Sequence, residues 1–354
     1  MLLCFLPMWY NCGRLLGVTQ VADKRVIITM PRIDRYGDIF QPDIMADLEQ
    51  SAEVLHNDLG RAFTTEELGE HARDCDAIIT AWGAPKIDKT VVDAAPKLRI
   101  IAHAAGSVKG LIAEEVYDAG ITVTNAALVM ATYVGEFALC LALAMLRTLP
   151  RYAYGAPREA WNDIPSAGNE TLHGKTVGII GLSHTGRAFL KLLAPFECNV
   201  IAYDPYYSDE RAAELGVKLV PLEELLSSSK VISLHAPITP ETVGILDSDK
   251  LKLIPDGAVF VNTARGLLLD HDALARELST GRFKAALDVT YPEPLPPDHP
   301  LRRLANVIIP PHIAGPTTDG RRDMFRCVVD DLKLFWAGKT PRNLVTKQML
   351  ERMA

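Results

Sequence analysis

The sequence lacks the cysteine patterns that mark disulfide-bonded and zinc-binding proteins. Its six cysteines lie at positions 4, 12, 75, 140, 198 and 327, with no CxxC pair and no cluster of cysteine and histidine at zinc-ligand spacing. We therefore expect no metal site, and we expect a reducing compartment, the cytoplasm, as the location of the protein.

An excess of positive charge is also missing. The chain has 37 Lys and Arg against 44 Asp and Glu, which gives a net charge of −7. Binding to a phosphate backbone or to anionic lipid requires a basic surface. We therefore expect neither nucleic acid nor a membrane among the partners.

Long hydrophobic runs are rare. The apolar N-terminus, MLLCFLPMWYN, follows no positive residue and is shorter than the ~20 residues that span a membrane. We interpret it as a disordered leader or as the product of a misplaced start. Residues 137–146 are apolar but lie between Glu136 and Arg147, which favours a buried helix over a membrane span.

What the sequence does contain is the composition and periodicity of an α/β protein. With 354 residues, 48% hydrophobic and 23% charged, it is long enough for two globular domains. Short β-branched runs alternate with amphipathic stretches, which is typical of βαβ units. The runs expected as strands are VIITM, AEVL, DAIITAW, LRIIAHA and ITVT, followed by TVGII, NVIAYD, KVISLHAP, AVFVNTA, AALDV and NVIIPP.

The order of these elements predicts two doubly wound parallel-sheet domains. A helix expected at about Thr132–Leu149 and an irregular segment separate the two series of strands. The last helix, expected at about Thr317–Trp336, has no sheet of its own, so we predict that it packs back on the first unit. This assigns residues 20–129 and 318–354 to one discontinuous domain and residues 130–317 to an inserted one. A ligand cleft is expected between them.

A phosphate-binding turn is predicted where TVGII runs into GLSHTG. A dinucleotide pyrophosphate needs a turn without bulky side chains and free N–H groups at a helix N-terminus. Gly181 and Gly186 fit this need, but Ser183 replaces the middle glycine of the G-x-G-x-x-G pattern. Its CH2OH group either crowds the pyrophosphate or donates a hydrogen bond to it. An ordinary strand–turn–helix explains the same glycines.

Asp204, at the end of the next strand, indicates which dinucleotide binds. A carboxylate there accepts hydrogen bonds from the adenosine ribose hydroxyls and repels a 2′-phosphate. The sequence therefore predicts NAD(H) rather than NADP.

Three chemically active residues follow three successive strands. Arg265 comes after AVFVNTA, Glu293 lies beyond AALDV, and His312 follows NVIIPP. Because the carboxyl ends of parallel strands meet at one edge, these residues can converge. An arginine can hold a carboxylate, a histidine can exchange a proton, and a glutamate can orient the histidine and favour its charged form. Each residue alone also has an ordinary explanation, as a helix cap, a solvated loop residue or a common histidine.

These motifs, in this order, resemble the D-isomer-specific 2-hydroxyacid dehydrogenases, which include glyoxylate/hydroxypyruvate reductases, phosphoglycerate dehydrogenases and D-lactate dehydrogenases. The resemblance covers about residues 75–335. It is carried by LRIIAHAAGSV, YVGEFALCLAL, TVGIIGLSHTGR, VISLHAPITPETVGIL, GAVFVNTARGLLLD, AALDVTYPEPLPPDHPL and NVIIPPHIAGPT. It implies a Rossmann NAD-binding domain inserted in a flavodoxin-like substrate domain, a homodimer, and NADH-dependent interconversion of a D-2-hydroxy acid and a 2-oxo acid.

The resemblance also implies a role for each site residue. Arg265 would bind the substrate, Glu293 would support the histidine, and His312 would be the acid/base. The amides of Gly106 and Ser107 would bind the substrate carboxylate. The implied cofactor contacts, with Gly181, Ser183, Gly186 and Asp204, are His184 and Thr185 at the pyrophosphate, His235, Pro237 and Thr242 along the cofactor path, and Thr263, Ala264, Asp288 and Gly315 at the nicotinamide.

Two departures from the family pattern bear on the substrate. Lys109 stands where many members have an aspartate, and it either accepts a second acidic group or is simply solvated. Trp82 stands where phosphoglycerate-using members often carry an arginine, and it either alters specificity or packs in the core. We expect glyoxylate or hydroxypyruvate as the substrate, and 3-phosphoglycerate second.

Two other functions use a similar architecture. One is an NAD-sensing corepressor with little catalysis, although the sequence shows no extended tail that suggests this role. The other is a formate dehydrogenase-like enzyme, in which a glutamine takes the place of the glutamate, so Glu293 argues against it.

Overall fold

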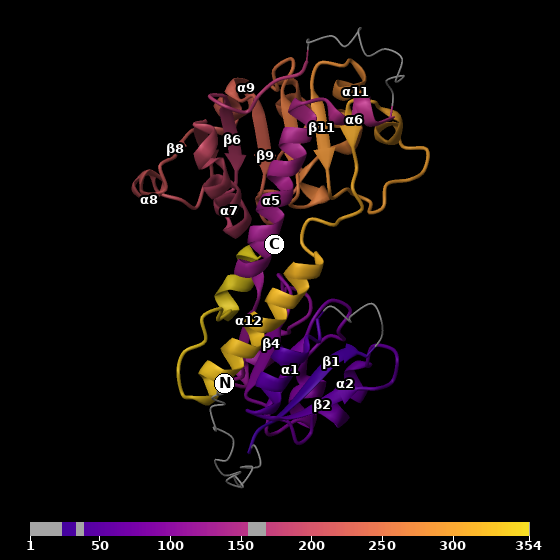
Figure 1. Ribbon diagram of the computed structural model, residues 1–354, viewed down its shortest axis with the longest axis vertical. Helices are drawn as coiled ribbons and strands as arrows, with labels where there is room; N and C mark the ends of the chain where they lie inside the picture. The colour runs from indigo at the N-terminus through magenta and orange to yellow at the C-terminus, as the bar shows by residue number, and fades with distance from the viewer. Residues whose placement is uncertain (1–22, 33–38, 155–167, 354) are drawn as a thin grey trace, which may run out of the picture.

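Two lobes, each built on a parallel β-sheet, make up the protein (Figure 1). The computed structural model describes residues 23–32, 39–154 and 168–353. The apolar N-terminal leader and most of the irregular segment between the two series of strands lie outside these residues.

The first lobe contains a five-stranded sheet in the order β2-β1-β3-β4-β5. This is the strand order of the flavodoxin-like fold, which the family resemblance implies for this domain. Its strands are β1 (Arg25–Pro31), β2 (Glu53–Asn57), β3 (Ala77–Thr80), β4 (Ile100–His103) and β5 (Thr122–Asn125).

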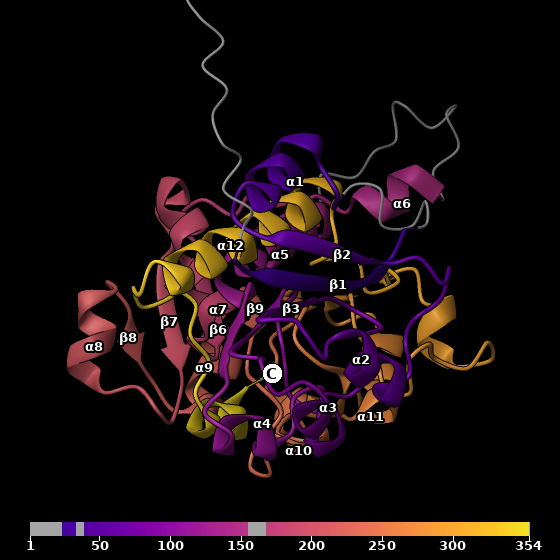
Figure 2. The same cartoon turned by 90° about the horizontal axis from the view of Figure 1, so that it is seen from below.

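Helices cover both faces of this sheet, which explains why its strands are apolar on both sides (Figure 2). One face is covered by α1 (Pro42–Glu49) and α12 (Thr318–Trp336). The other is covered by α2 (Thr65–His71), α3 (Lys89–Ala94) and α4 (Glu114–Asp118). The last helix therefore returns to the first sheet, and its Met324, Phe325 and Val328 pack with Val26 and Ile28.

The second lobe contains a seven-stranded sheet in the order β12-β11-β10-β9-β6-β7-β8. The order reverses beside β6, which is the doubly wound arrangement of dinucleotide-binding folds. Its strands are β6 (Thr176–Ile180), β7 (Asn199–Tyr203), β8 (Lys218–Leu219), β9 (Val231–Leu234), β10 (Val259–Asn262), β11 (Lys284–Leu287) and β12 (Val307–Ile308). The sequence did not predict β8, which is short and half polar.

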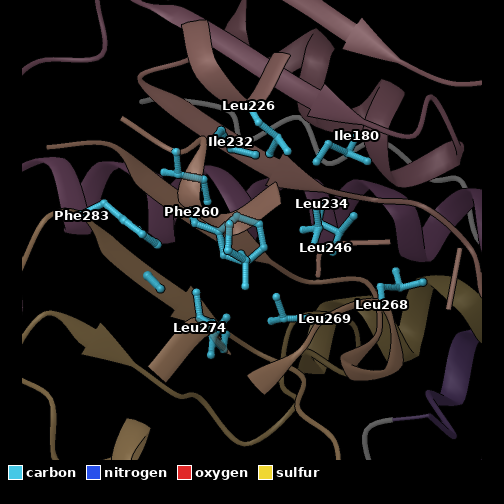
Figure 3. Close-up of a cluster of buried hydrophobic side chains, with 14 of the residues drawn as sticks. Ile180, Leu226, Ile232, Leu234, Leu246, Phe260, Leu268, Leu269, Leu274 and Phe283 are labelled. Atoms are coloured by element: carbon cyan, nitrogen blue, oxygen red, sulfur yellow. The ribbon is translucent and has the colours of Figure 1, made fainter. Parts of the chain in front are cut away.

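Within the described ranges, six helices cover the seven-stranded sheet. One face carries α5 (Ala127–Leu146), α7 (His184–Leu193) and α8 (Asp209–Glu214), and α6 (Leu149–Tyr154) follows α5 in the chain. The other face carries α9 (Leu222–Ser228), α10 (Ser248–Lys252) and α11 (His271–Ser279). Figure 3 shows the centre of this second layer, where Phe260 is surrounded by leucine and isoleucine side chains. This packed core fixes the strand ends that carry the candidate site.

Helix α5 connects the two sheets. It begins at Ala127, five residues before the predicted start, and the Ala127 N–H donates to Oδ1 of Asn125 at 3.2 Å. It is long and apolar enough to cross a membrane by length and composition, and 39% of that apolar window is buried. Its inner face packs on α7, where a Cβ at Gly135 would lie 2.8 Å from the Phe189 nitrogen. Residues 137–146 thus form part of a core helix, as predicted.

Candidate active site

The glycine turn after β6 is closed too tightly for side chains. Gly181 has φ of +93°, and a Cβ there would lie 2.7 Å from the Ala236 nitrogen. A Cβ on Gly186 would overlap the Gly181 carbonyl oxygen. Both positions therefore require glycine. The turn leads directly into α7, whose first two residues are His184 and Thr185.

Ser183, the departure from the glycine pattern, caps this helix. Its φ of −60° is ordinary for any residue, so glycine is not required there. The hydroxyl donates to the His235 carbonyl at 2.8 Å and accepts from the Gly186 N–H at 3.4 Å. In this arrangement the hydroxyl proton is used inside the turn and is not available to a ligand.

Asp204 lies at the end of β7 against the same turn. One carboxylate oxygen accepts from the Leu182 N–H at 2.8 Å, and the other accepts from the Tyr206 N–H at 2.9 Å. These two bonds hold the carboxylate beside the glycine turn, at the place where the sequence expects an acidic group.

Two buried polar atoms near the turn have no hydrogen-bond partner among the described residues. They are Nδ1 of His235, at the end of β9, and Oγ1 of Thr263, at the end of β10. Burial lowers the pKa of His235 to about 3, so its ring is neutral. Orphaned buried polar atoms are rare in proteins and indicate a missing ligand or water. Further along the same edge, Thr242 donates to the Pro237 carbonyl at 2.6 Å.

Glu293 and His312 form a direct pair. Glu293 Oε1 lies 2.6 Å from His312 Nδ1, and the two side chains are 41% and 47% exposed. The bond fixes the imidazole and leaves its other nitrogen, Nε2, for exchange with a ligand. The structure therefore joins two of the three residues predicted to work together.

Asp288 holds the turn that carries His312. His312 has φ of 55°, in the left-handed region that a non-glycine residue rarely adopts, and its N–H donates to the Asp288 carbonyl at 3.0 Å. The Asp288 carboxylate accepts from the N–H groups of Ile313 and Ala314 at 2.9 and 3.0 Å. Burial raises the pKa of Asp288, while these two hydrogen bonds oppose the rise. The contacts of Asp288 in this structure therefore support the backbone turn that carries His312.

Arg265 follows β10 and is held by its neighbours. Asn262, at the end of the strand, accepts from the Ala264 N–H at 2.9 Å and donates to the Arg265 carbonyl at 3.1 Å. The guanidinium donates to the Ala264 carbonyl at 2.7 Å. Burial lowers the pKa of Arg265, and the charge of Glu293 raises it, so the two groups lie within electrostatic range. Among the described residues, Arg265 and His312 form neither a hydrogen bond nor an ion pair with each other.

A hollow of about 600 Å³ borders the pair. Its lining includes Asp288, Glu293 and His312, together with apolar side chains such as Leu301 and Ile309. Arg265 does not line this hollow, so the predicted triad is only partly gathered around it.

The loop after β4 approaches the seven-stranded sheet. The Met130 side chain of α5 lies against Gly106 of this loop, and its sulfur would be 3.1 Å from a Cβ at Gly315, beyond His312. Lys109 donates to the Ile238 carbonyl at 3.2 Å and so connects the loops after β4 and β9. The predicted substrate loop and the predicted cofactor edge therefore face each other.

Trp82, after β3, is half-buried and packs against the cluster that includes Phe325. This agrees with the core-packing interpretation of that residue. Lys109, by contrast, is exposed but not simply solvated, because it makes the Ile238 hydrogen bond.

Comparison with known proteins agrees with the family resemblance of the sequence. The family model described as "D-isomer specific 2-hydroxyacid dehydrogenase, NAD binding domain" matches residues 139–314. The chain is 36% identical to a glyoxylate reductase of Korarchaeum cryptofilum over 80% of this chain and 86% of that one. It belongs to the D-isomer-specific 2-hydroxyacid dehydrogenase family.

Other members are also similar. The chain is 35% identical to a D-3-phosphoglycerate dehydrogenase of Archaeoglobus fulgidus over 84% of this chain, but it spans only 56% of that protein. A crystal structure of a phosphoglycerate oxidoreductase from Rhizobium etli superimposes with a TM-score of 0.76, 27% identity, and coverage of 91% of this chain and 98% of that one. The protein is accordingly an NAD-dependent oxidoreductase, and its seven-stranded sheet is the NAD-binding unit.

Proposed function

We propose that the protein reduces a small 2-oxo acid to the D-2-hydroxy acid with NADH, and catalyses the reverse reaction with NAD. The observation that carries this proposal is the 2.6 Å Glu293–His312 pair, which lies on the sheet edge that also bears the glycine turn. A histidine backed by a carboxylate suits exchange of the hydroxyl proton.

The residues of the turn fit a dinucleotide. The space kept open by Gly181 and Gly186, the helix N-terminus at His184 and Thr185, and the carboxylate of Asp204 together suit a pyrophosphate and a ribose. The unpartnered Oγ1 of Thr263 offers a hydrogen bond at the end of β10. When bound there, NADH supplies the hydride.

The chain's own residues would bind and orient the acid. We infer that the N–H groups of Gly106 and Ser107 bind the substrate carboxylate, because neither donates a hydrogen bond within the described part of the chain. Arg265 would hold the carboxylate and polarise the carbonyl, since its half-buried guanidinium has a fixed position and strong charge.

His312 would exchange the proton. In the reduction, the protonated ring gives its proton from Nε2 to the forming alkoxide, while Glu293 stabilises the imidazolium through Nδ1. Removing this donor is expected to lower the rate by about 10²- to 10⁴-fold.

NAD(H) is the proposed cofactor rather than NADP(H). Asp204 is held by two backbone N–H groups beside the turn, so its charge would repel a 2′-phosphate. Glyoxylate or hydroxypyruvate is the proposed substrate, supported by the glyoxylate reductase relative, which this chain matches over most of its length. We propose 3-phosphoglycerate only as the second choice, because Trp82 packs in the core and stands where phosphoglycerate-using members often carry an arginine.

We also propose a homodimer. The outward face of α5 carries exposed Cys140 and half-buried Leu139 and Leu143, and Leu149 of α6 is 53% exposed. Such an apolar face suits a second copy of the chain. The molecular mass in solution, compared between the wild type and Cys140→Glu, tests this proposal, and a monomeric wild type would contradict it.

A panel of 2-oxo acids assayed with NADH and NADPH tests the proposed function. We expect turnover of at least one small acid by the wild type and its near loss in His312→Ala, with NADH binding retained. NADH binding without turnover of any acid would instead favour the sensor function. Near-normal turnover in His312→Ala would remove His312 as the proton donor.

A further inference from the structure

Polar side chains at the ends of three neighbouring strands lie next to the loop after β4, which contains Gly106 and Ser107. Thr80 ends β3, His103 ends β4 and Asn125 ends β5. All three are buried, with exposures of 0%, 3% and 6%. None was selected from the sequence as a site residue. Each is polar; Asn125 and His103 hydrogen-bond to the proposed carboxylate-binding loop, and Thr80 contacts the His103 ring.

Asn125 makes the most direct contact. Its side-chain Nδ2 donates to the Gly106 carbonyl at 2.6 Å, and its Oδ1 accepts from the Ala127 N–H at 3.2 Å. The second bond fixes the orientation of the amide, so that the NH2 group must face Gly106. Main-chain bonds hold the neighbouring peptide, because the Ala126 N–H donates to the Ala105 carbonyl at 2.9 Å.

The Gly106 carbonyl belongs to the same peptide group as the Ser107 N–H. A hydrogen bond to the carbonyl oxygen of a peptide polarises its N–H group, because bonds in a chain strengthen one another. Asn125 therefore both orients the Ser107 N–H and makes it a better donor toward an anion on the other side of the peptide.

His103, at the end of β4, supports the next peptide of the loop, Ser107–Val108. Its Nδ1 lies 2.7 Å from Thr80 Oγ1, and the ring also makes a hydrogen bond with the Ser107 carbonyl. Burial lowers the pKa of His103 to about 4, so the ring stays neutral and keeps this arrangement near neutral pH. The flexible end of Met130 fills the space beside Gly106.

We propose that Asn125 is a positioning residue for substrate binding, which holds the Gly106–Ser107 peptide so that its N–H binds the carboxylate of the 2-oxo acid. This inference rests on the proposed function. It adds a residue that touches neither substrate nor cofactor and that acts only through the peptide.

Asn125→Asp and Asn125→Ser test the proposal with glyoxylate as substrate and oxamate as an unreactive 2-oxo acid analogue. Both variants lose the donor to Gly106, and Asp also brings a negative charge toward the bound carboxylate. We expect KM and the oxamate Ki to rise about 3- to 10-fold in Asn125→Ser, as expected for one lost hydrogen bond, and further in Asn125→Asp. The kcat and the NADH Kd are expected to stay within about twofold of the wild type.

Asn199→Asp is the matched control, since Asn199 is exposed at the start of β7, on the opposite edge of the other sheet. If Asn125→Asp fails to fold, Thr80→Val removes the hydroxyl beneath His103 and is expected to raise KM in the same direction. Unchanged KM and Ki in folded Asn125→Ser would overturn the inference. So would an equal loss of kcat and NADH binding, which indicates a merely structural role.

The activity and ligand binding of the wild type distinguish failure of the Asn125 proposal from failure of the proposed function. If it turns over glyoxylate and the Asn125 variants have unchanged KM, only the positioning role fails. If it binds NADH but neither reduces any 2-oxo acid nor binds oxamate, the proposed function fails, and the role of Asn125 fails with it.

Discussion

Glu293 Oε1 and His312 Nδ1 lie 2.6 Å apart, although 19 residues separate them in the sequence. They meet because each follows a strand of the seven-stranded sheet, β11 and β12, whose neighbouring carboxyl ends are held in parallel register. The Asp288 carboxylate, also at the end of β11, holds the turn of His312 in place. The geometry of the pair is therefore set by the sheet and by one buried acid.

Replacing Glu293 by Gln tests the charge in this pair. The amide keeps the size and a hydrogen bond to Nδ1, but it cannot stabilise a charged imidazolium. We expect kcat for 2-oxo acid reduction to fall about 10- to 100-fold, the effect of one charged hydrogen bond. Steady-state kinetics at saturating NADH measures the change.

A second carboxylate–histidine pair on the surface provides the control. Glu197 Oε2 lies 3.2 Å from His173 Nε2, and both side chains are well exposed. Glu197→Gln is expected to leave kcat unchanged. Equal kcat in Glu293→Gln and the wild type would show that the charge of Glu293 has no part in the reaction.

Asp204→Asn tests the cofactor preference. Without the negative charge, the repulsion of a 2′-phosphate is lost, so the KM ratio of NADPH to NADH should fall by about 10-fold, which corresponds to about 1.4 kcal/mol. Asp209→Asn, at the exposed start of α8, is the control. An unchanged ratio in Asp204→Asn would mean that another group selects the cofactor.

Gly186→Ala and Gly106→Ala should affect different ligands. At Gly186 the new methyl group meets the Gly181 carbonyl, which is backbone and cannot move away, so the turn must distort. At Gly106 it meets the end of the Met130 side chain, which can change rotamer. We expect Gly186→Ala to weaken NADH binding by at least about 10-fold, because the closely approaching backbone depends on glycine.

The readouts are the NADH Kd from fluorescence titration and the KM of glyoxylate. Gly106→Ala is expected to change only the KM of the acid. NADH binding that is equally weak in the two variants would contradict this separation of the two sites.

The sequence predicted the elements that depend on local pattern. Apolar strands, the glycine turn and the returning α12 all leave a periodic or compositional signal. The strand β8 leaves none, since Lys218–Leu219 is too short. The start of α5 has no standard cap side chain at Ala126, and the Ala127 N–H bonds to the Asn125 side chain instead, so the sequence carries no usual start signal there.

The site was predictable only to the extent that strand ends converge. The pairing of Glu293 with His312 follows from that rule. The Lys109–Ile238 hydrogen bond does not, because it joins loops of different sheets 129 residues apart. Nor does Asn125, although an Asn directly after the strand ITVT is a signal that could have been weighed. Contacts between sheets depend on how the two lobes pack, which local pattern does not encode.

The buried histidines should make the stability of the protein depend on pH. The pKa of His103 is lowered by burial to about 4, and that of His235 to about 3, from an ordinary value of 6.5. Between pH 6.5 and 4 the unfolded chain therefore binds more protons than the folded one, and the free energy of unfolding falls as the pH falls. Each histidine contributes a slope of up to about 1.4 kcal/mol per pH unit in this range.

Urea unfolding at pH 7.5, 6 and 5 measures this slope in the wild type and in His103→Gln. The variant has lost one buried imidazole, so its free energy of unfolding should fall less between pH 6 and pH 5, by roughly 1 kcal/mol. His173→Gln is the control, because His173 is exposed. Its slope should equal that of the wild type. Parallel curves for the wild type and His103→Gln would show that His103 does not remain neutral in the folded protein, and that the support under the loop after β4 differs from the one described above.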